Sequence, residues 1–305
     1  MANDTGAYVS PTEAMIWTRG LGKRYGSFQA LEGLNLGVAR GEVYGFLGLN
    51  GAGKSTTIRL LCGLLRPTEG HIRIGGEPLM WPDKRQVRRR IGYLPQSVRF
   101  QEAMNAAYLI HFYARLSGVD GAEAVRKAAE MEIPMNRKLG LMSPGQQRKL
   151  GLLLATLGDP ELLFLDEPTA GLDPEGQAEV RRIIAHWQQQ GMTVFVSSHI
   201  LGEIQQICTS VGILHQGRLL RSGPLEEAYE IEVSDFSPER WQASPHPLRL
   251  LPGGNGTQRL LARVPKRRVP DIVSWLVESD VSVYGIKEQS LESMFSLVVG
   301  GEEVG

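Results

Sequence analysis

A glycine-rich segment near the start of the chain limits the possible folds more than any other part of the sequence. Residues 43–47 form an apolar run that predicts a buried strand, and GLNGAGKSTTIRLLCGLL follows directly. Apolar residues then recur at helical spacing from Ile58 onward. The expected order is strand, glycine loop and helix, which is the order that a phosphate-binding loop (P-loop) requires.

Four residues of this loop fit the pattern G-x-x-x-x-G-K-[ST]: Gly48, Gly53, Lys54 and Ser55. Glycines let backbone N–H groups close around phosphates, the lysine reaches the terminal phosphates, and the serine hydroxyl coordinates Mg²⁺. The alternative is a glycine-rich surface turn, which the flanking strand and helix disfavour.

Strands and helices alternate again further along the chain. The run ELLFL ends in Asp166, a helix is expected through Trp187, and the β-branched run MTVFVSS leads to His199. This alternation predicts a parallel sheet. Residues 100–132 predict an all-helical insertion, and VGILHQGRLLRSG predicts a hairpin.

Two neighbouring carboxylates follow the apolar run LLFL. A P-loop needs a carboxylate on a neighbouring strand to hold the magnesium shell, and Asp166 is placed for that task. Glu167 comes next and would polarise the water that attacks the γ-phosphate. Two acids after a strand often only begin a polar turn, but the P-loop upstream favours the catalytic interpretation.

Composition excludes several classes of protein. The 305 residues carry 33 basic and 33 acidic side chains, so no overall basic field attracts nucleic acid. Cys62 and Cys208 form no C-x-x-C pair, so neither a disulfide framework nor a zinc site is indicated, and a reducing cytosol fits. Because the sequence has neither a signal peptide nor a run of about 18 apolar residues, we expect a folded protein that neither crosses a membrane nor is exported.

The ordered motifs resemble those of the ATP-binding cassette (ABC) ATPases over roughly residues 15–230. GLNGAGKST is similar to the Walker A loop, LLFLDEP to Walker B, MSPGQQRK to the ABC signature, GLD to the D-loop and SSH to the switch-histidine segment. Many P-loop proteins share the first two, and the last three are typical of the cassette family. The resemblance implies an α/β P-loop NTPase fold with a RecA-like core, an antiparallel β subdomain and a helical subdomain, and it implies ATP and Mg²⁺ as ligands.

The resemblance also assigns roles to individual residues. Glu167 and His199 are expected to be catalytic, and Asp173 of the D-loop is expected to lie where two cassettes meet. The implied metal contacts are Ser55, Gln96 and Asp166. The implied ATP-binding residues are Tyr25, Gly48, Asn50, Gly51, Ala52, Gly53, Lys54, Ser55 and Thr56. The signature residues that would face the ATP of a second cassette are Ser143, Gly145 and Gln146.

Four of these assignments compete with ordinary structural roles. Asp173 could merely start a turn before Pro174, and His199 could cap the end of a strand. Tyr25 could pack in a turn instead of stacking on adenine, and Gln96 could be a single polar loop residue. Their places within the ordered motifs favour the functional interpretation.

The signature segment also predicts the start of a helix. Ser143 is expected to be the N-cap and Pro144 the first helical residue, so the positive helix end and its free N–H groups would face a γ-phosphate. An ordinary helix start is the alternative. Pro144 stands where the family more often has glycine and removes one N–H donor, while Gly145 keeps its own. We therefore expect a weaker but retained signature function.

We divide the sequence into a tail (1–13), a cassette (14–230) with its helical subdomain at about 97–158, and a small C-terminal α+β domain (231–305). A cluster of Pro, Gly and Ser after the cassette predicts a partly linker-like segment. The basic clusters KRQVRRR and KRR are expected to be solvated faces, and a membrane-facing role is the alternative. The last expected helix, residues 290–298, reads SLESMFSLV and is similar to the S-L-E-x-x-F segment of type-2 ABC exporter subunits.

Together these features predict an ATP-binding, ATP-hydrolysing subunit of an ABC transporter, of the export type. The resemblance implies two partners, a second cassette, expected to be another copy of this chain, and a separately encoded transmembrane permease. It implies a peripheral place on the cytoplasmic face of the inner or plasma membrane. The alternative is a cassette ATPase with a non-transport role, coupled mechanically or as a regulator to another complex. An inactive ATP-binding module is disfavoured because the catalytic residues are present.

Overall fold

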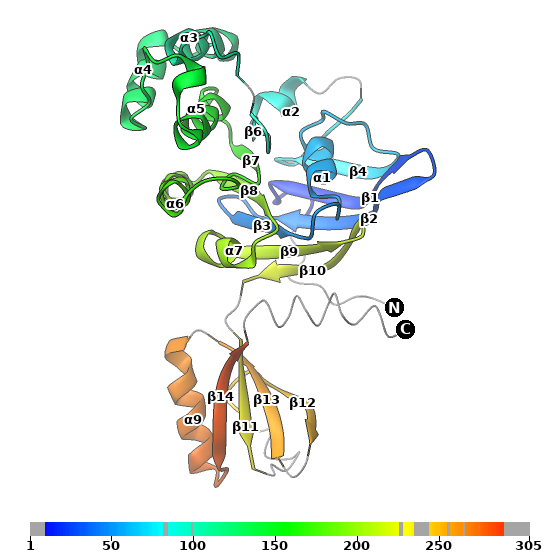
Figure 1. The fold of residues 1–305 in the computed structure, drawn as a ribbon. Helices are drawn as coiled ribbons and strands as arrows, with labels where there is room; N and C mark the ends of the chain where they lie inside the picture. The colour runs from blue at the N-terminus through cyan, green and yellow to red at the C-terminus, as the bar shows by residue number, and fades with distance from the viewer. Residues whose placement is uncertain are drawn as a thin grey trace. The chain divides into compact units, whose positions relative to one another are not determined.

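The computed structural model describes residues 10–81, 85–98, 100–225, 228–234, 244–254, 257–264 and 266–289. Contacts divide the chain into two units, Met1–Pro224 and Leu225–Gly305 (Figure 1). Each unit has its own sheet structure and its own hydrophobic core.

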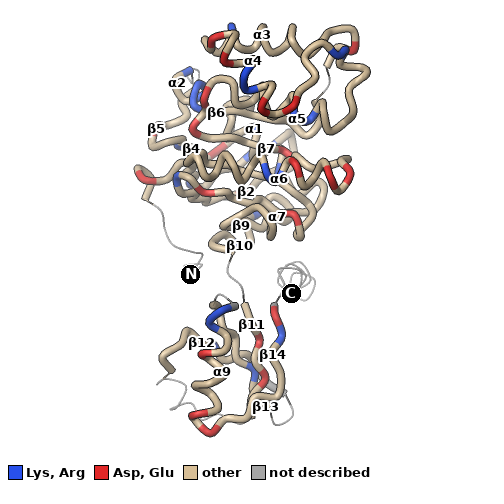
Figure 2. Tube along the Cα trace, turned by 90° about the vertical axis from the view of Figure 1, so that its left-hand side faces the viewer, with Lys and Arg blue, Asp and Glu red and all other residues tan. Residues whose placement is uncertain are grey.

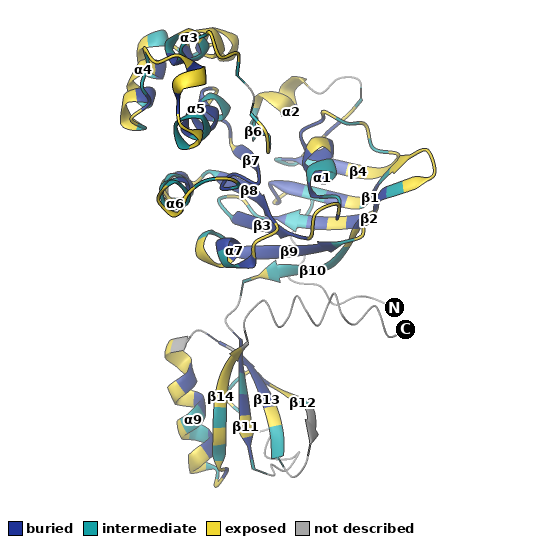
Figure 3. Cartoon of the chain, in the orientation of Figure 1, coloured by how far each residue is buried: buried dark blue, intermediate teal, exposed yellow. Residues whose placement is uncertain are grey.

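A six-stranded sheet is the centre of the first unit, in the order β10-β9-β3-β8-β7-β6. From β9 to β6 all neighbours are parallel, and β10 pairs antiparallel with β9, so the predicted parallel sheet is confirmed. Its central strands β3, β7 and β8 are buried along their whole length (Figure 3), as expected of a parallel sheet covered on both faces. The strands are β3 (Val43–Leu47), β6 (Ile91–Leu94), β7 (Leu162–Asp166), β8 (Thr193–Ser198), β9 (Ser210–His215) and β10 (Arg218–Pro224).

The hairpin β9–β10 turns at Gln216 and Gly217. Both residues have positive φ, 46° and 80°. A two-residue turn with two positive φ angles matches the right-handed twist of the strands that it joins. The hairpin predicted around this Gln-Gly pair is therefore confirmed.

A second, antiparallel sheet packs in the same unit, in the order β2-β1-β4-β5. β1 and β2 form a long hairpin, and β4 pairs with the other edge of β1. The strands are β1 (Ile16–Tyr25), β2 (Phe28–Val38), β4 (Glu69–Ile74) and β5 (Glu77–Pro78).

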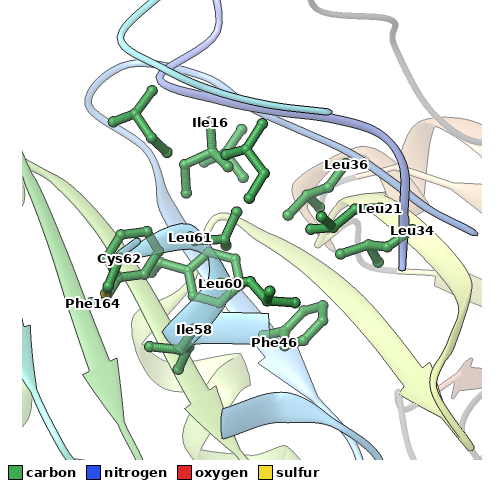
Figure 4. Close-up of a cluster of buried hydrophobic side chains, with 14 of the residues drawn as sticks. Ile16, Leu21, Leu34, Leu36, Phe46, Ile58, Leu60, Leu61, Cys62 and Phe164 are labelled. Carbon is green, nitrogen blue, oxygen red and sulfur yellow. The ribbon is translucent and has the colours of Figure 1, made fainter. Parts of the chain in front are cut away.

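Helix α1 (Lys54–Leu61) joins the two sheets through one core (Figure 4). Its apolar residues Ile58, Leu60 and Leu61 are fully buried in one cluster with strand residues from both sheets. Burial of a leucine or isoleucine side chain contributes about 1.5–3 kcal/mol. The helix that follows the glycine loop is therefore fixed on both sides.

The other face of the parallel sheet is covered by α5, α6 and α7. Val180, Ile184 and Trp187 of α6 share a core with alternate residues of β7 and β8. Helices α3, α4 and α5 pack together around a separate small core and form the predicted helical insertion. The remaining helices of this unit are α2 (Arg85–Arg89), α3 (Ala106–Ser117), α4 (Gly121–Glu130), the 3₁₀ turn η1 (Leu139–Leu141), α5 (Pro144–Thr156), α6 (Pro174–Gln189) and α7 (Leu201–Ile207).

The second unit is a four-stranded antiparallel sheet, in the order β12-β13-β11-β14, with α9 on one face. Ile272 and Leu276 of α9 are fully buried against Ile231 and Leu260 of the sheet. The elements are β11 (Ala228–Val233), β12 (Leu248–Gly254), β13 (Thr257–Arg263), the 3₁₀ turn η2 (Lys266–Arg268), α9 (Val269–Glu278) and β14 (Val283–Gln289).

The structure differs from the sequence-based boundaries in two places. The division between the units falls after Pro224 and not after residue 230, because β11 pairs with β13 and β14 in the sheet of the second unit. Strand β12 lies in the segment in which we expected a partial linker. The last predicted helix, 290–298, lies outside the described residues.

Both cysteines are free thiols. Burial raises the pKa of Cys62 and of Cys208 far above the ordinary thiol range. Because the thiolate is the reactive form, neither side chain is suited to redox chemistry or metal binding.

Arg40, Arg90 and Glu161 form an ion-paired cluster near the start of β6. Arg88 and Arg89 of α2 are exposed, and Figure 2 shows α2 as a basic stretch. Arg90 instead donates two hydrogen bonds of 2.6 Å to the Glu161 carboxylate, from Nε and Nη2. Arg40 donates to the Gly75 carbonyl oxygen, in the turn after β4, and lies 3.4 Å from Glu161. The Arg90–Glu161 pair thus joins the segments before β6 and β7 of the six-stranded sheet, and Arg40 links it to the turn after β4 of the antiparallel sheet.

Glu161→Gln tests the strength of this ion pair. Hydrogen bonds from Arg90 lower the pKa of Glu161, so its stabilising effect is present above the unfolded value of about 4.3 and is lost as the pH falls through the lower folded value. Since both side chains are partly exposed, we expect a loss of about 0.5–1 kcal/mol at pH 7. Urea unfolding at pH 7 and at about pH 3 should show this loss shrinking only below the unfolded pKa of about 4.3. A loss that stays constant with pH, or one that persists fully in an Arg90→Gln background, would contradict the assignment.

Candidate nucleotide-binding site

The loop between β3 and α1 (residues 48–53) contains two glycines that the fold requires. A Cβ on Gly48 would lie 2.5 Å from the carbonyl oxygen of Leu214, and one on Gly53 would lie 2.7 Å from that of Ala30. Gly53 also has a φ of 107°, in the left-handed region that favours glycine. Any larger residue at either position would displace the loop.

The residues between these glycines form the outer part of the loop. Asn50 and Gly51 are exposed, whereas Ala52 is buried and accepts a 3.0 Å hydrogen bond from the Gly217 amide. Thr56 is half-buried in the first turn of α1. Amides of a first helical turn have no partner within the helix, so this end of α1 can receive an anionic phosphate.

Lys54 begins α1 and is folded back across the loop. Its Nζ donates to the carbonyl oxygens of Gly48 at 2.7 Å and Leu49 at 3.1 Å, and lies 3.4 Å from Oε1 of Glu167. The side chain is only 5% exposed, so water screens its charge weakly. Phosphate oxygens are stronger partners for an ammonium group than neutral carbonyls, so Lys54 is placed to bind one.

Glu167 is the point at which three predicted residues meet. Oε2 accepts a hydrogen bond from Nε2 of Gln96 at 3.1 Å and lies 3.3 Å from Nδ1 of His199. Oε1 faces Lys54 at the distance given above. The carboxylate is 8% exposed and the imidazole 39%, so the acid is sheltered while the histidine reaches the surface.

The backbone of Glu167 is strained. Its φ is 47°, a left-handed conformation that costs about 1–3 kcal/mol for a residue with a side chain. Side chains alternate along β7, and this alternation points Asp166 toward α1. The turn at Glu167 interrupts the alternation, so the Glu167 side chain takes a different direction. Strain of this kind persists only where the surroundings hold it, and it concentrates at functional sites.

The predicted metal ligands fit Mg²⁺ in their donor chemistry. Ser55 offers a hydroxyl, Gln96 an amide oxygen and Asp166 a carboxylate, and Mg²⁺ prefers oxygen donors of this kind. Asp166 is 1% exposed; Oδ1 accepts a 2.6 Å hydrogen bond from Ser197, and Oδ2 has none among the described residues. The second oxygen of this carboxylate is therefore available to an ion or its water shell. Within the described ranges no three His, Cys, Asp or Glu side chains form a metal cluster, and an ion shared with phosphates needs none.

The turn around His199 is held by its neighbours. Ser198 donates to Oε2 of Glu203 at 2.7 Å, and the amide of Ile200 donates to the Ser198 hydroxyl at 2.9 Å. Glu203 lies on α7 and is 8% exposed. These bonds fix the backbone on both sides of His199, so the imidazole can stay near Glu167 although it is exposed.

The predicted signature residues begin α5 as expected. Ser143 is the N-cap, Pro144 is the first helical residue, and Ser143 and Gln146 form a reciprocal capping box. The Gln146 amide donates to Ser143 Oγ at 3.2 Å, and the Ser143 amide donates to Gln146 Oε1 at 3.1 Å. Gly145 follows the exposed Pro144 in the first turn and is itself half-buried. In Figure 1, α5 lies with α3 and α4 in the helical insertion, whereas α1 lies with the sheets. The structure therefore does not bring the signature to the P-loop of its own chain.

Arg148 links the signature helix to the loop that carries Gln96. Its guanidinium donates to the carbonyl oxygens of Gln96 at 3.2 Å and Pro95 at 3.5 Å. Burial lowers the pKa of Arg148, yet an arginine stays charged in proteins. The Glu167 carboxylate and α5 are therefore connected through only two side chains, Gln96 and Arg148.

Asp173 and Tyr25 lie away from this centre. Asp173 is the exposed N-cap of α6 and accepts a 2.9 Å hydrogen bond from the Gly176 amide. Tyr25 ends β1 with 45% of its surface exposed, opposite Phe28, and the Lys23 ammonium lies 5.1 Å from the centre of its ring. The structure gives each residue an ordinary local role and leaves each accessible to a ligand or partner.

Three residues of this site were not singled out from the sequence: Arg148, Ser197 and Ser198. The two serines stand in the quoted segment SSH, where polar residues end an apolar strand. That break in polarity was the available signal, since a buried hydroxyl must find a hydrogen-bond partner. Arg148 carried no such signal, because its acceptors are backbone carbonyls some 50 residues away.

Among the described residues, no helix combines the length and the apolar character that crossing a bilayer requires.

Known proteins are similar to this chain in sequence and in fold. Residues 31–170 match the family described as ABC transporter. The chain is 41% identical over 216 residues to the bacitracin transport ATP-binding protein BcrA of Bacillus licheniformis, a match that covers 70% of each chain. It is 36% identical over 221 residues to the daunorubicin resistance ATP-binding protein DrrA3 of Streptomyces coeruleorubidus, again over 70% of each. A solved dimeric structure of a bacterial ABC transporter cassette superposes with a TM-score of 0.64 at 25% identity, over 69% of this chain and 99% of the other.

Proposed function

From its membership in the family of ABC transporter ATP-binding proteins, whose cassettes hydrolyse ATP, we propose that this chain drives export through a separate membrane permease. The observation that carries the catalytic part of the proposal is the buried Glu167 carboxylate, which Lys54, Gln96 and His199 surround at 3.1–3.4 Å.

In the proposed reaction the P-loop holds the phosphates of ATP. Amides at the start of α1 and the Lys54 ammonium neutralise the β- and γ-phosphate charge. When bound, Mg²⁺ supplies further neutralisation of phosphate charge, and Ser55, Asp166 and Gln96 would hold it. Glu167 accepts a hydrogen bond from the attacking water and orients it in line with the γ-phosphate. His199 keeps the Glu167 carboxylate in place and reaches outward to the phosphate.

We also propose that two cassettes act as a pair, with two copies of this chain as the simplest arrangement. The N-terminus of α5, which Ser143 caps, would complete the site of the opposite copy, and exposed Asp173 would lie between the copies. The dimeric cassette that this fold resembles supports such pairing. ATP would close the pair and hydrolysis would reopen it.

The names of two relatives support an export role. One relative is a bacitracin transport protein and the other a daunorubicin resistance protein. By analogy, this chain would sit on the cytoplasmic face of the inner or plasma membrane, bound peripherally to a permease encoded separately. The permease would determine which substance is moved.

Replacement of the proposed base separates binding from turnover. Glu167→Gln should keep ATP binding, lower the rate of Mg²⁺-dependent phosphate release by about 10²–10⁴-fold, and trap a closed pair that size-exclusion chromatography detects. Lys54→Ala should instead abolish binding of a fluorescent ATP analogue. Near-normal turnover by Glu167→Gln would refute the assignment of the base.

Pro144→Gly tests the signature. The change restores one N–H donor, worth about 0.5–1.5 kcal/mol, and should lower the ATP concentration that closes the Glu167→Gln pair by about threefold to tenfold. Sedimentation velocity across an ATP titration would measure it, with the single Glu167→Gln variant as reference. Unchanged dimerisation and turnover would mean that Pro144 does not weaken the signature.

A tagged pull-down from gently solubilised native membranes tests the transport role, with mass spectrometry of stoichiometric partners. We expect a polytopic membrane protein among them. If only soluble proteins co-purify, with none from the membrane fraction, the non-transport cassette role replaces this proposal.

A further inference from the structure

We propose that Ser197 is a positioning residue for ATP hydrolysis, whose hydroxyl holds the Asp166 carboxylate and the Glu167 backbone in one geometry. The inference rests on the proposed function, in which Asp166 serves the metal shell and Glu167 the attacking water. It adds a residue that acts on both acids at once.

Strand pairing places Ser197 beside the two acids. Ser197 lies near the end of β8, in register with Asp166, the last residue of β7. Side chains alternate along a strand, and both residues share the face of Phe164 and Phe195, which pack in the core that contains α1. Ser197 has no exposed surface, so its hydroxyl must be satisfied within the protein.

The hydrogen bonds of this hydroxyl have only one possible direction. A backbone N–H can only donate, so the bond of 3.0 Å between the Glu167 amide and Ser197 Oγ makes the hydroxyl an acceptor there. Its single proton then goes to Oδ1 of Asp166, 2.6 Å away. Oδ1 is thereby fixed, which leaves Oδ2 of Asp166 for the metal shell.

The same hydroxyl supports the strained turn at Glu167. The Glu167 amide is shared between Ser197 Oγ and the Ser197 carbonyl oxygen, the latter at 3.2 Å. This shared bond anchors a residue whose φ is 47°. The turn in turn aims the Glu167 side chain at Lys54, Gln96 and His199. Loss of the hydroxyl would leave only the longer backbone contact.

A second hydroxyl on the same strand provides a matched control. Thr193 begins β8, is fully buried, and accepts a 2.9 Å hydrogen bond from the Gly41 amide. It therefore resembles Ser197 in burial and in bonding a backbone amide, but it lies at the opposite end of β8. Thr193→Val should cost stability without moving either acid.

The test compares Ser197→Ala, Ser197→Thr and Thr193→Val in the full chain. For Ser197→Ala we expect kcat to fall about tenfold or more and KM for ATP to stay within about twofold. The Mg²⁺ concentration that half-saturates the Mg²⁺-dependent binding of a fluorescent ATP analogue should rise about threefold or more, since Asp166 is no longer fixed. Ser197→Thr keeps the hydroxyl and should recover most of both losses. Thr193→Val should match the unmodified chain in kcat and in the Mg²⁺ titration.

Two results would overturn the proposal. One is Ser197→Ala with unchanged kcat and unchanged Mg²⁺ titration. The other is Thr193→Val with losses equal to those of Ser197→Ala at a comparable fall in Tm, because the effect would then be general destabilisation. If the added methyl of Ser197→Thr lowers Tm, the Mg²⁺ titration of Ser197→Ala decides the matter alone. Glu167→Gln, assayed in parallel, shows separately whether the base assignment itself has failed.

Discussion

The parallel pairing of β3, β8 and β7 is the constraint on which the whole site depends. Parallel neighbours end at the same edge, so the pairing brings together three segments that are far apart in sequence: the glycine loop after β3, the acids at the end of β7, and the serines and histidine at the end of β8. Helix α1 stays over this edge because both sheets bury its apolar residues. The position of the site at this edge is thus held largely by apolar packing around α1.

Within that frame, charge is balanced around one buried carboxylate. A buried ion pair such as Lys54 with Glu167 adds little to stability, because desolvation offsets the attraction between the charges. The pair serves to position the side chains. When phosphate binds the Lys54 ammonium in place of Glu167, Gln96 and His199 still hold the Glu167 carboxylate. The backbone strain at Glu167 also lowers the stability of the fold, and in return it orients the Glu167 carboxylate.

Much of this could be predicted from the sequence, because the glycine loop, the acids and SSH each follow or end an apolar run, which sets their place at the edge of the sheet. Polarity patterns do not give strand register, so the contact of Ser197 with Asp166 could not be predicted. Bonds to backbone, such as those of Arg148, leave no mark in residue type. Strand β12 was missed because its leucines are followed by Pro252, Gly253 and Gly254, which suggest a loop.

The hydrogen bond from Arg148 to the Gln96 carbonyl oxygen connects the helical insertion, α3, α4 and α5, to the nucleotide site. If ATP at Glu167 favours one position of the Gln96 loop, it also favours one position of α5. Linkage between equilibria is reciprocal, so whatever binds α3, α4 or α5 and prefers that position must tighten ATP binding by the same factor. The effect of a partner on ATP binding and the effect of ATP on that partner would then be two consequences of one equilibrium.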